Sequence, residues 1–414
     1  MKTKISSADL PTVALPNQPV NQRDFPNQLD GPRKMGVEIE LFIVDIESEQ
    51  PMVIGPEIVA SVHGSAKQQV RLENLACQIE LVSRPHSNLS DLRADLEALI
   101  EEVSGIARAM GAKLLWSGNH PQLAYEEQVK TECARSIHNR RRLGGAIEAL
   151  GMCGVHFHVE TTKDEAIRVV DELQTFLSLL VALAANSPID KGRNSGFRSK
   201  RASDWNGQVG VSGFSGPYRD WGGFNRQMAN FIDARRIETP KDNYSFVRPT
   251  TLGTVEVRCC DTPMNLDQVI AVATLVKTLV EAIAMGDLNV ERTRDCLEAE
   301  FHEAALRGPK ANLMNHRGEL MSPIQWLNQL SSELQLTAMM IGTDWALRLA
   351  PSYLLVNGST EQLAKFEREE QRSAEEVLVL PVSAKPAPAS PGRLGWSLAA
   401  AAAALVSLLA QVVV

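Results

Sequence analysis

Acidic residues and histidines recur at alternate positions in four short segments of this chain. In the first segment, residues 34–45, Glu38 and Glu40 alternate with Val37, Ile39 and Leu41. This period of two is typical of a half-buried strand, so both carboxylates are expected on one face and the apolar side chains on the other. Carboxylates on an open face are the ligands that hard cations such as Mg2+ prefer. The comparable residues of the three later segments are Glu80, His156, His158, Glu256 and Arg258.

The recurrence of this pattern favours a metal site over a merely solvated surface. A single glutamate on a strand is usually only exposed to water. Four strands that pack side by side would bring several like charges together, and these repel each other unless cations lie between them. The excess of carboxylates favours Mg2+ or Mn2+ over Zn2+, which prefers cysteine and histidine. The four strands are predicted at residues 34–45, 77–83, 154–160 and 254–260.

The residues alone leave the roles of the histidines and of the arginine open. His156 and His158 on one strand face are consistent with metal ligation, with an acid–base pair or with a polar stripe. Arg258, two residues after Glu256, suits a salt bridge and also suits a phosphate held by the same metal. The arginine beside the predicted metal ligands therefore points to nucleotide chemistry.

That chemistry is expected without the common phosphate-binding motifs. The sequence contains no G-x-x-x-x-G-K-[ST] loop, no G-x-G-x-x-G after a predicted strand and no G-x-S-x-G elbow. A glycine-punctuated cationic loop, residues 191–198, carries Arg193 and Arg198. Such a loop would suit closure over phosphates. We therefore name Arg193, Arg198 and Arg258 as candidate phosphate ligands.

Helical periodicity indicates the elements that must position these strands. Apolar residues recur at steps of three and four over residues 89–110, with Ser90 as the expected N-cap and Gly111 as the stop. Strands separated by helices predict an α+β domain, with helices on one face of the sheet and the acids on the open face. Further helices are predicted over residues 136–150, 164–186, 267–285, 290–306 and 360–377, and another begins at Ser322 and Pro323.

Composition restricts the class of protein. The 414 residues carry a formal net charge of -8, and no basic run appears, so nucleic acid is not an expected partner and small molecules are. The six cysteines form no C-x-x-C pair and indicate a reduced, cytoplasmic protein. The N-terminus lacks the apolar stretch of a signal peptide.

The sequence divides into four parts. Residues 1–33 are predicted to form an extended lead-in, 34–380 the catalytic domain, 381–394 a Pro/Ala-rich linker and 395–414 an uncharged hydrophobic tail. The tail is just long enough to span a bilayer. A membrane tether, a peripheral or partner-binding helix and a dispensable extension all stay open for this segment.

Five blocks occur in order along the chain, GVEIE (36–40), QIE (78–80), CGVHFH (153–158), ANSP (185–188) and TVEVRCCD (254–261). Together they resemble the bacterial glutamate–cysteine ligase type 2 family of ATP-dependent carboxylate–amine ligases. The similarity runs from Lys34 to the helix after Asp267 and continues more weakly to about Val377. This resemblance implies an antiparallel sheet curved into a saddle, as in glutamine synthetase and the guanidino kinases, with helices on its convex face.

The resemblance also implies the roles of individual residues. Arg258 would contact the transferring phosphate, and it is named with Glu256 as catalytic. His156 is favoured over His158 as a ligand, because the first histidine after Cys-Gly-Val matches the family position. Ile39 replaces an acid often found there in the family, but it faces the core, so metal binding is expected to survive. The implied ligands of Mg2+, with Mn2+ as the alternative ion, are Glu38, Glu40, Glu73, Glu80, His156 and Glu256.

The expected reaction is an ATP-dependent ligation through an acyl phosphate. The γ-phosphate of ATP moves to a substrate carboxylate, and an amine then displaces phosphate to form an amide. The family implies glutamate as the donor and cysteine or another amine as the acceptor, and we expect a homo-oligomer. The alternatives are a guanidino kinase-like phosphotransferase and a catalytically degenerate, metal-binding or membrane-tethered interaction protein.

Overall fold

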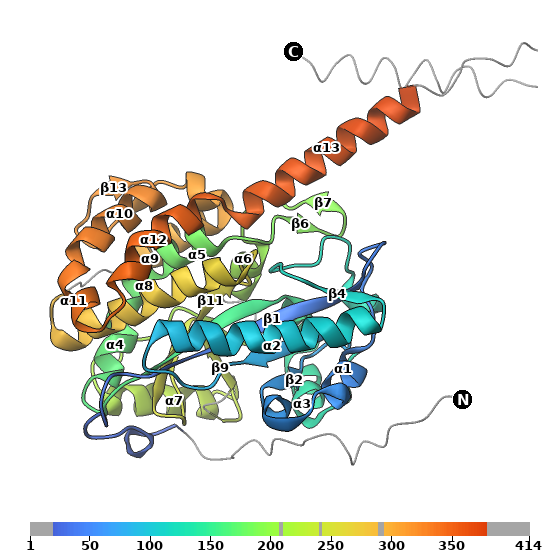
Figure 1. Ribbon diagram of the computed structural model, residues 1–414. Coiled ribbons are helices and arrows are strands. Elements are labelled where there is room, and N and C mark those ends of the chain that lie inside the picture. The colour runs from blue at the N-terminus through green and yellow to red at the C-terminus, as the bar shows by residue number, and fades with distance from the viewer. Residues whose placement is uncertain (1–19, 207–209, 240–241, 289–293, 379–414) are drawn as a thin grey trace, which may run out of the picture. The chain divides into compact units, whose positions relative to one another are not determined.

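The computed structural model describes residues 20–206, 210–239, 242–288 and 294–378 (Figure 1). The predicted linker, 381–394, and the predicted hydrophobic tail, 395–414, lie outside these residues. Packing divides the chain into a compact unit that ends at Phe366 and a second unit from Glu367 to Val414. The described part of the second unit continues the helix α13 (Gly358–Leu378).

A seven-stranded antiparallel sheet forms the centre of the first unit, as far as the described residues extend. Its strand order is β10-β11-β5-β1-β3-β2, and β4 also pairs with β1. The four strands that were predicted from alternation are β1, β3, β5 and β11, and they are neighbours in the sheet in the order β11-β5-β1-β3. The prediction of an α+β fold with an antiparallel sheet is confirmed. The strands are β1 (Met35–Asp45), β2 (Val70–Leu72), β3 (Gln78–Val82), β4 (Ala112–Leu115), β5 (Gly154–Glu160), β10 (Val247–Pro249) and β11 (Thr254–Asp261).

One face of the sheet is covered by helices. The apolar residues of β1 and β5, among them Ile39, Leu41 and Phe157, are fully buried. The helices α2 (Leu89–Ala109), α4 (Ala166–Leu173), α5 (Leu177–Ala184) and α8 (Leu266–Met285) contact the strands. In Figure 1, α2 and α8 cross in front of the sheet. Burial of this apolar face fixes the register, because a shift of one residue would turn the acids into the core.

The helix α2 shows how a sequence pattern becomes a buried face. Its leucines at positions 89, 92, 96 and 99 lie on one stripe and are buried. The N-cap is Asn88, whose side chain accepts a hydrogen bond from the backbone N–H of Asp91, and the expected cap at Ser90 is therefore wrong. Asn88 precedes the first helical residue in an extended conformation, which the N-cap position requires. Gly111 follows the helix at a φ of +78°, as its predicted role as a stop demands.

The helix α8 is long and apolar enough to cross a membrane by composition, but 83% of its apolar window is buried inside the protein. It packs against α2, α4 and α12 (Asp344–Leu355). A helix that is apolar on all sides and buried on all sides is a core helix. Among the described residues, no other helix passes the same test.

Several predicted helices have different limits in the structure. The predicted helix 136–150 is α3 (Ala134–Leu143) followed by a 3-10 helix, Gly144–Gly151. The predicted helix 164–186 is interrupted by a 3-10 turn, Gln174–Phe176, between α4 and α5. The helix predicted at 290–306 is α9 (Arg294–Arg307), and its predicted first residues lie outside the described part of the chain. Ser322 caps α10 (Pro323–Glu333) with a capping box, as predicted.

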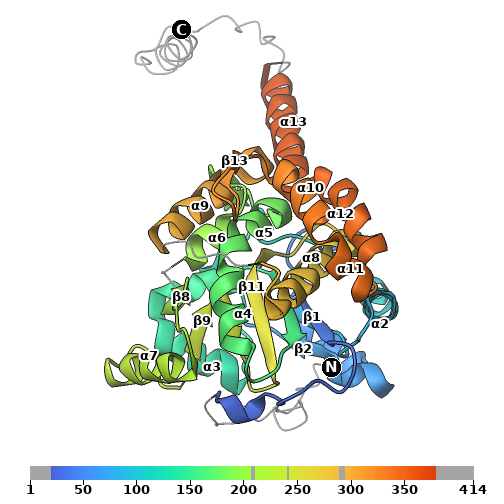
Figure 2. The ribbon, with the colours of Figure 1, turned by 90° about the vertical axis from the view of Figure 1, so that its left-hand side faces the viewer.

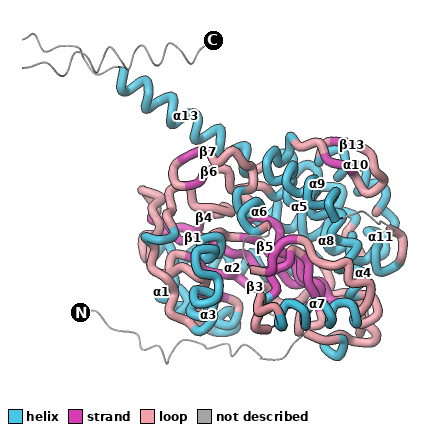
Figure 3. Tube along the Cα trace, turned by 180° about the vertical axis from the view of Figure 1, so that it is seen from behind, coloured by secondary structure: helices cyan, strands magenta, loops and turns pink. Residues whose placement is uncertain are grey.

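The remaining elements surround the sheet. Seen from behind in Figure 3, the sheet is flanked by α3, α6 and α7 and by loops, and Figure 2 shows α4 beside β11. The α-helices and strands not yet named are α1 (Gly55–Ser61), β6 (Ile189–Asp190), β7 (Arg193–Asn194), α6 (Lys200–Trp205), β8 (Val211–Gly213), α7 (Trp221–Asp233), β9 (Asn243–Ser245), β12 (Leu313–Met314), β13 (Leu320–Met321) and α11 (Gln335–Met340).

The described part of the N-terminal lead-in packs against the rest of the first unit. Phe25 is buried and its ring lies 5.2 Å from that of Trp221. Arg33 is also buried, and its guanidinium forms ion pairs with Glu165 at 3.2 Å and with Glu281 at 2.7 Å. Residues 20–33 are therefore held to the rest of the first unit by an aromatic contact and by a buried charge.

Candidate functional site

The register of the sheet brings the predicted acids and histidines into one cluster. Glu38 of β1 is the cross-strand partner of His156 of β5, and Glu40 is the partner of Glu80 of β3. On the far side of β5, Glu256 of β11 is the partner of His158. Direct cross-strand partners share a face, so four strands present these side chains on the face opposite the helices.

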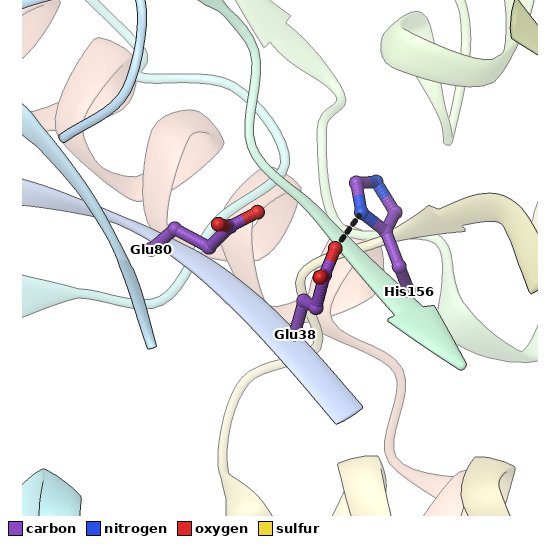
Figure 4. A group of neighbouring side chains, drawn as sticks. All are labelled: Glu38, Glu80 and His156. Atoms are coloured by element: carbon purple, nitrogen blue, oxygen red, sulfur yellow. Dashed lines mark hydrogen bonds and ion pairs between the residues drawn. The ribbon is translucent and has the colours of Figure 1, made fainter. Parts of the chain in front are cut away.

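The side chains of this cluster lie within contact distance of each other. His156 Nδ1 is 3.2 Å from Glu38 Oε2, and Figure 4 shows this pair with Glu80 beside it. His156 Nε2 lies 3.7 Å from Glu40 Oε1. His158 Nε2 lies 3.6 Å from both Glu38 Oε1 and Glu256 Oε1. The carboxylate oxygens and the imidazole nitrogens thus converge on one region of the sheet.

Three groups in this cluster have the composition and spacing of a cation site, with one ligand atom per residue and all ligand atoms within 4.8 Å of one another. Every residue that was predicted as a metal ligand falls into at least one group. Glu73, which follows β2, is one of them and is buried. His158 also belongs to a group, so the structure brings both histidines to the cluster. The groups are Glu38, Glu80 and His156; Glu38, His158 and Glu256; and Glu40, Glu73 and Glu80.

Burial and mutual repulsion divide the acids into two sets. Burial alone would raise the pKa of Glu38, but His158 and His156 outweigh it and hold the pKa well below its usual value. Burial, together with Glu73, raises the pKa of Glu40 to about 7. Burial, together with Glu38 and Glu73, raises the pKa of Glu80 well above its usual value. Without a cation, these two carboxyl groups therefore bind protons more readily than a solvated glutamate does.

The two histidines each have a ring nitrogen that the described protein groups leave without a hydrogen bond and that a metal could bind. His156 Nε2 and His158 Nε2 are buried and have no hydrogen-bond partner in the described part of the chain. Burial, followed by the charge of Arg258, lowers the pKa of His156 to about 3, so its imidazole is neutral and has a free lone pair. Unpartnered buried nitrogens beside carboxylate oxygens match the mixed donor set of a divalent cation.

Arginines surround the cluster, and three of them were not predicted. Arg258 forms an ion pair with Glu256, and Arg248 Nε lies 2.7 Å from Glu256 Oε2. Although burial opposes it, the charges of Arg248 and Arg258 keep the pKa of Glu256 low. Arg71 Nη1 lies 3.4 Å from Glu80, and Arg135 Nη1 lies 3.3 Å from Glu73. The site is therefore positive at its rim and negative at its centre.

The alternation in the sequence does not identify Arg71 or Arg248 as part of the cluster. Arg71 lies directly opposite Glu80 in the β2–β3 pair, and Arg248 lies opposite Glu256 in the β10–β11 pair. Both sit on strands of three residues, which are too short to show a period of two. Arg135 opens the basic helix α3, whose charge is visible in the sequence but whose orientation is not.

The predicted phosphate ligands of the cationic loop lie on another segment. Arg193 is exposed on β7, which pairs with β6 in a short hairpin. The backbone N–H of Arg198 donates to Ala305 O, and its side chain lies close to Gly308. Their role as phosphate ligands stays a prediction. Arg258, by contrast, lies in the cluster, and its Nε is buried without a hydrogen-bond partner among the described residues.

Solved structures of two ligases share this fold. A glutamate–cysteine ligase from Francisella tularensis, solved in complex with AMP, matches with a TM-score of 0.60 at 14% identity, over 87% of this chain and 91% of that chain. A bifunctional glutathione synthetase from Pasteurella multocida matches with a TM-score of 0.57 at 14% identity, over 82% of this chain and 50% of that one. The fold is therefore that of ligases built on an antiparallel sheet.

The sequence places the chain within that class. A family model for Glutamate-cysteine ligase family 2 (GCS2) matches residues 34–379, and the chain belongs to this family. A protein of Mycolicibacterium smegmatis, provisionally named glutamate–cysteine ligase 2-3, is 30% identical over 83% of this chain and 95% of its own length. A similarly named protein of Gloeobacter violaceus is 26% identical over 79% of this chain and 91% of its own length. The chain is thus an ATP-dependent, amide-forming ligase of the glutamate–cysteine ligase type.

Proposed function

We propose that this enzyme joins the carboxylate of glutamate to the amino group of cysteine or a related amine, with ATP and Mg2+ at the acid cluster. The observation that carries this proposal is the convergence of Glu38, Glu40, Glu80, His156 and Glu256 from four strands onto one face. Such a cluster of carboxylates and imidazoles binds divalent cations, which in turn bind polyphosphates.

The residues of the cluster and of the cationic loop would bind the metal and the phosphates. Mg2+, or Mn2+ in its place, would be held by the acids and histidines of the cluster, which are Glu38, Glu40, Glu73, Glu80, His156, His158 and Glu256. When bound, the cation neutralises the phosphate oxygens and positions them for transfer. Arg258 would bind the transferring phosphate through its unpartnered Nε, and Glu256 would hold that guanidinium in place through their ion pair. Arg193 and Arg198 would contact phosphates from the cationic loop.

The reaction needs no covalent intermediate on the enzyme. A glutamate carboxylate oxygen attacks the γ-phosphorus of ATP, the bond to ADP breaks, and an acyl phosphate forms. The amine nitrogen then attacks the acyl carbon, phosphate leaves with the bonding electron pair, and the nitrogen loses a proton to solvent. The protein supplies position and charge, which explains why no nucleophilic side chain is needed at the cluster.

The remaining assignments are part of the same proposal. We infer that the enzyme works in the cytoplasm as a homo-oligomer and that residues 395–414 are available to tether it to a membrane. The reduced state of all six cysteines supports the compartment, since none forms a disulfide.

The experiment is an assay of ADP release over a matrix of acidic amino acids and amines, with mass spectrometry of the products. We expect ADP release that requires Mg2+ or Mn2+, glutamate and an amine, and a product whose mass is that of the two substrates minus water. EDTA should abolish the activity, and added Mg2+ should restore it. A stable phosphorylated product formed without an amine would instead indicate a guanidino kinase-like phosphotransferase. Absence of ADP release with every pair would favour a degenerate binding protein.

A further inference from the structure

Arg71 contacts the two acids that the candidate cation groups share. Its Nη1 lies 3.4 Å from Glu80 Oε2 and 3.6 Å from Glu38 Oε1. Glu38 belongs to two of the three groups, and Glu80 also belongs to two. A single guanidinium nitrogen therefore faces the oxygens on which most of the cation site depends.

These contacts are looser than the contact of Arg248 with Glu256, and they resemble that of Arg135, whose Nη1 lies 3.3 Å from Glu73 Oε1. A charge-assisted hydrogen bond between arginine and a carboxylate is usually about 2.7–2.9 Å long and often uses two nitrogens. Arg248 reaches Glu256 at 2.7 Å, and its side chain is 19% exposed. Arg71 uses one nitrogen at the longer distances, and its side chain is 42% exposed. Arg71 can therefore leave the acids at low cost, because solvent already surrounds much of its side chain.

We propose that Arg71 is a displaceable counter-ion, which neutralises Glu38 and lies beside Glu80 when the site holds no cation and moves to the phosphates of the nucleotide when a cation binds. This inference rests on the proposed function, since it requires the acid cluster to be a cation site. The buried Nε2 atoms of His156 and His158, which have no hydrogen-bond partner among the described residues, support that premise.

The physical argument is a competition for the same oxygens. A divalent cation approaches carboxylate oxygens to about 2.0–2.6 Å and carries twice the charge of a guanidinium, so it wins the shared oxygens when both are present. The displaced guanidinium then stands at the rim of a site that attracts a polyphosphate. Removal of the charge of Arg71 should consequently raise the affinity for the cation and lower the affinity for the nucleotide.

The test measures binding rather than turnover. Mn2+ alone is titrated into the purified full-length protein and followed by electron paramagnetic resonance, and a non-hydrolysable ATP analogue with Mg2+ is titrated by calorimetry. We expect Arg71→Gln to bind Mn2+ about tenfold more tightly than the wild type, because one positive charge has left the ligand oxygens. The same variant should bind the nucleotide analogue more weakly.

Two variants make the result specific. Arg71→Lys keeps the charge and should retain the weak Mn2+ binding of the wild type. Arg84→Gln removes a guanidinium that is 50% exposed and pairs with Asp95 at 2.7 Å, so it changes the net charge equally at a different ion pair and should leave both affinities unchanged.

The outcomes separate the two proposals. Mn2+ binding to Arg71→Gln that is equal to or weaker than that of the wild type overturns the counter-ion role, and unchanged or tighter nucleotide binding overturns the phosphate contact. If the wild-type protein binds no Mn2+, then the metal site of the proposed function fails, and the inference about Arg71 fails with it.

Discussion

Glu40 of β1 and Glu80 of β3 are direct partners across the sheet, and both are buried. Burial and the neighbouring Glu73 raise the pKa of Glu40 to about 7, and the pKa of Glu80 is raised well above its usual value by burial, Glu38 and Glu73. Two buried carboxyl groups in register oppose folding unless a proton or a cation lies between them. Such a pair lowers the stability of the fold, so its presence in this sheet indicates a functional site.

A first prediction concerns Glu256, which has a structural and a chemical role. Glu256→Gln leaves the buried guanidinium groups of Arg248 and Arg258 without their counter-charge, and we expect the free energy of unfolding to fall by about 3 kcal/mol. We also expect ADP formation to be lost, because one cation group loses a ligand. Urea denaturation and an ADP assay at low temperature check the two effects separately.

The matched control for this variant is Glu160→Gln. Glu160 ends β5 and pairs with Thr254 across the strand, and its carboxylate accepts a hydrogen bond from the backbone N–H of Lys34. This glutamate lies on the same strand as the histidines but in none of the cation groups. ADP formation by Glu160→Gln should stay close to that of the wild type. A folded Glu256→Gln protein with full activity would contradict the metal role.

A second prediction separates transition-state from ground-state binding at Arg258. Charge develops on the phosphate oxygens as the phosphoryl group transfers, so a buried guanidinium beside them stabilises the transition state more than bound ATP. We expect Arg258→Ala to lower kcat about a hundredfold and to change the KM for ATP much less. Steady-state kinetics with varied ATP measure this split.

The control variant here is Arg84→Ala, which removes a guanidinium that pairs with Asp95. Its kinetic constants should match those of the wild type. If Arg258→Ala instead raises the KM for ATP and leaves kcat unchanged, Arg258 binds the nucleotide without a preference for the transition state.

The sequence predicts the cluster better than it predicts the surroundings. Alternation fixes which residues of β1, β3, β5 and β11 share a face, because each of these strands has one apolar side, although the acid-bearing side is also largely buried in the structure. It does not reveal which strands are neighbours, and that pairing brings Arg71 and Arg248 to the acids. The limits of the helices were least predictable. The N-cap Asn88 and the break at Gln174–Phe176 depend on backbone geometry that apolar periodicity does not report.

A third prediction concerns Gly154, where the backbone lies close to a buried arginine. A Cβ atom at this position would lie 2.2 Å from Arg201 Nη2. Arg201 is held in place by the carbonyl oxygens of Arg258 and Cys260, where the register of β11 against β5 shifts, so it cannot move freely. We expect Gly154→Ala to reduce the free energy of unfolding by about 1–3 kcal/mol. It should also lower activity, because Gly154 N donates to Glu40 Oε2 at 2.6 Å.

Gly105→Ala is the matched control for that substitution. Gly105 lies within α2, and a Cβ atom there would meet no other atom within 4 Å. Alanine is a better helix former than glycine, so this variant should be more stable than the wild type by about 0.5–1 kcal/mol. Replacement of glycine by alanine should therefore lower the free energy of unfolding at position 154 and raise it at position 105. Equal stability changes in urea denaturation would argue against the packing of Arg201 described above.

The final prediction concerns pH and Lys277, which lies in the core helix α8 and donates a hydrogen bond to Ser87 O. Burial lowers the pKa of Lys277 to about 8, although Glu281 opposes the shift. An unfolded lysine has a pKa of about 10.4, so between these values the unfolded chain binds more protons than the folded chain, and stability rises with pH. Below about pH 8 both states are protonated, and the cost of burying the charge is constant.

Lys277→Met removes this charge and should therefore be more stable than the wild type near pH 7, by on the order of 2 kcal/mol after the loss of the hydrogen bond to Ser87. The advantage should shrink as the pH rises from 8 to 10, because the wild-type lysine becomes neutral in the folded state. Urea denaturation of both proteins at several pH values measures the difference. Lys113→Met, at a lysine that pairs with Glu49 in a largely exposed ion pair, should show no such trend. A difference between wild type and Lys277→Met that is independent of pH would show that Lys277 is not buried in its charged form.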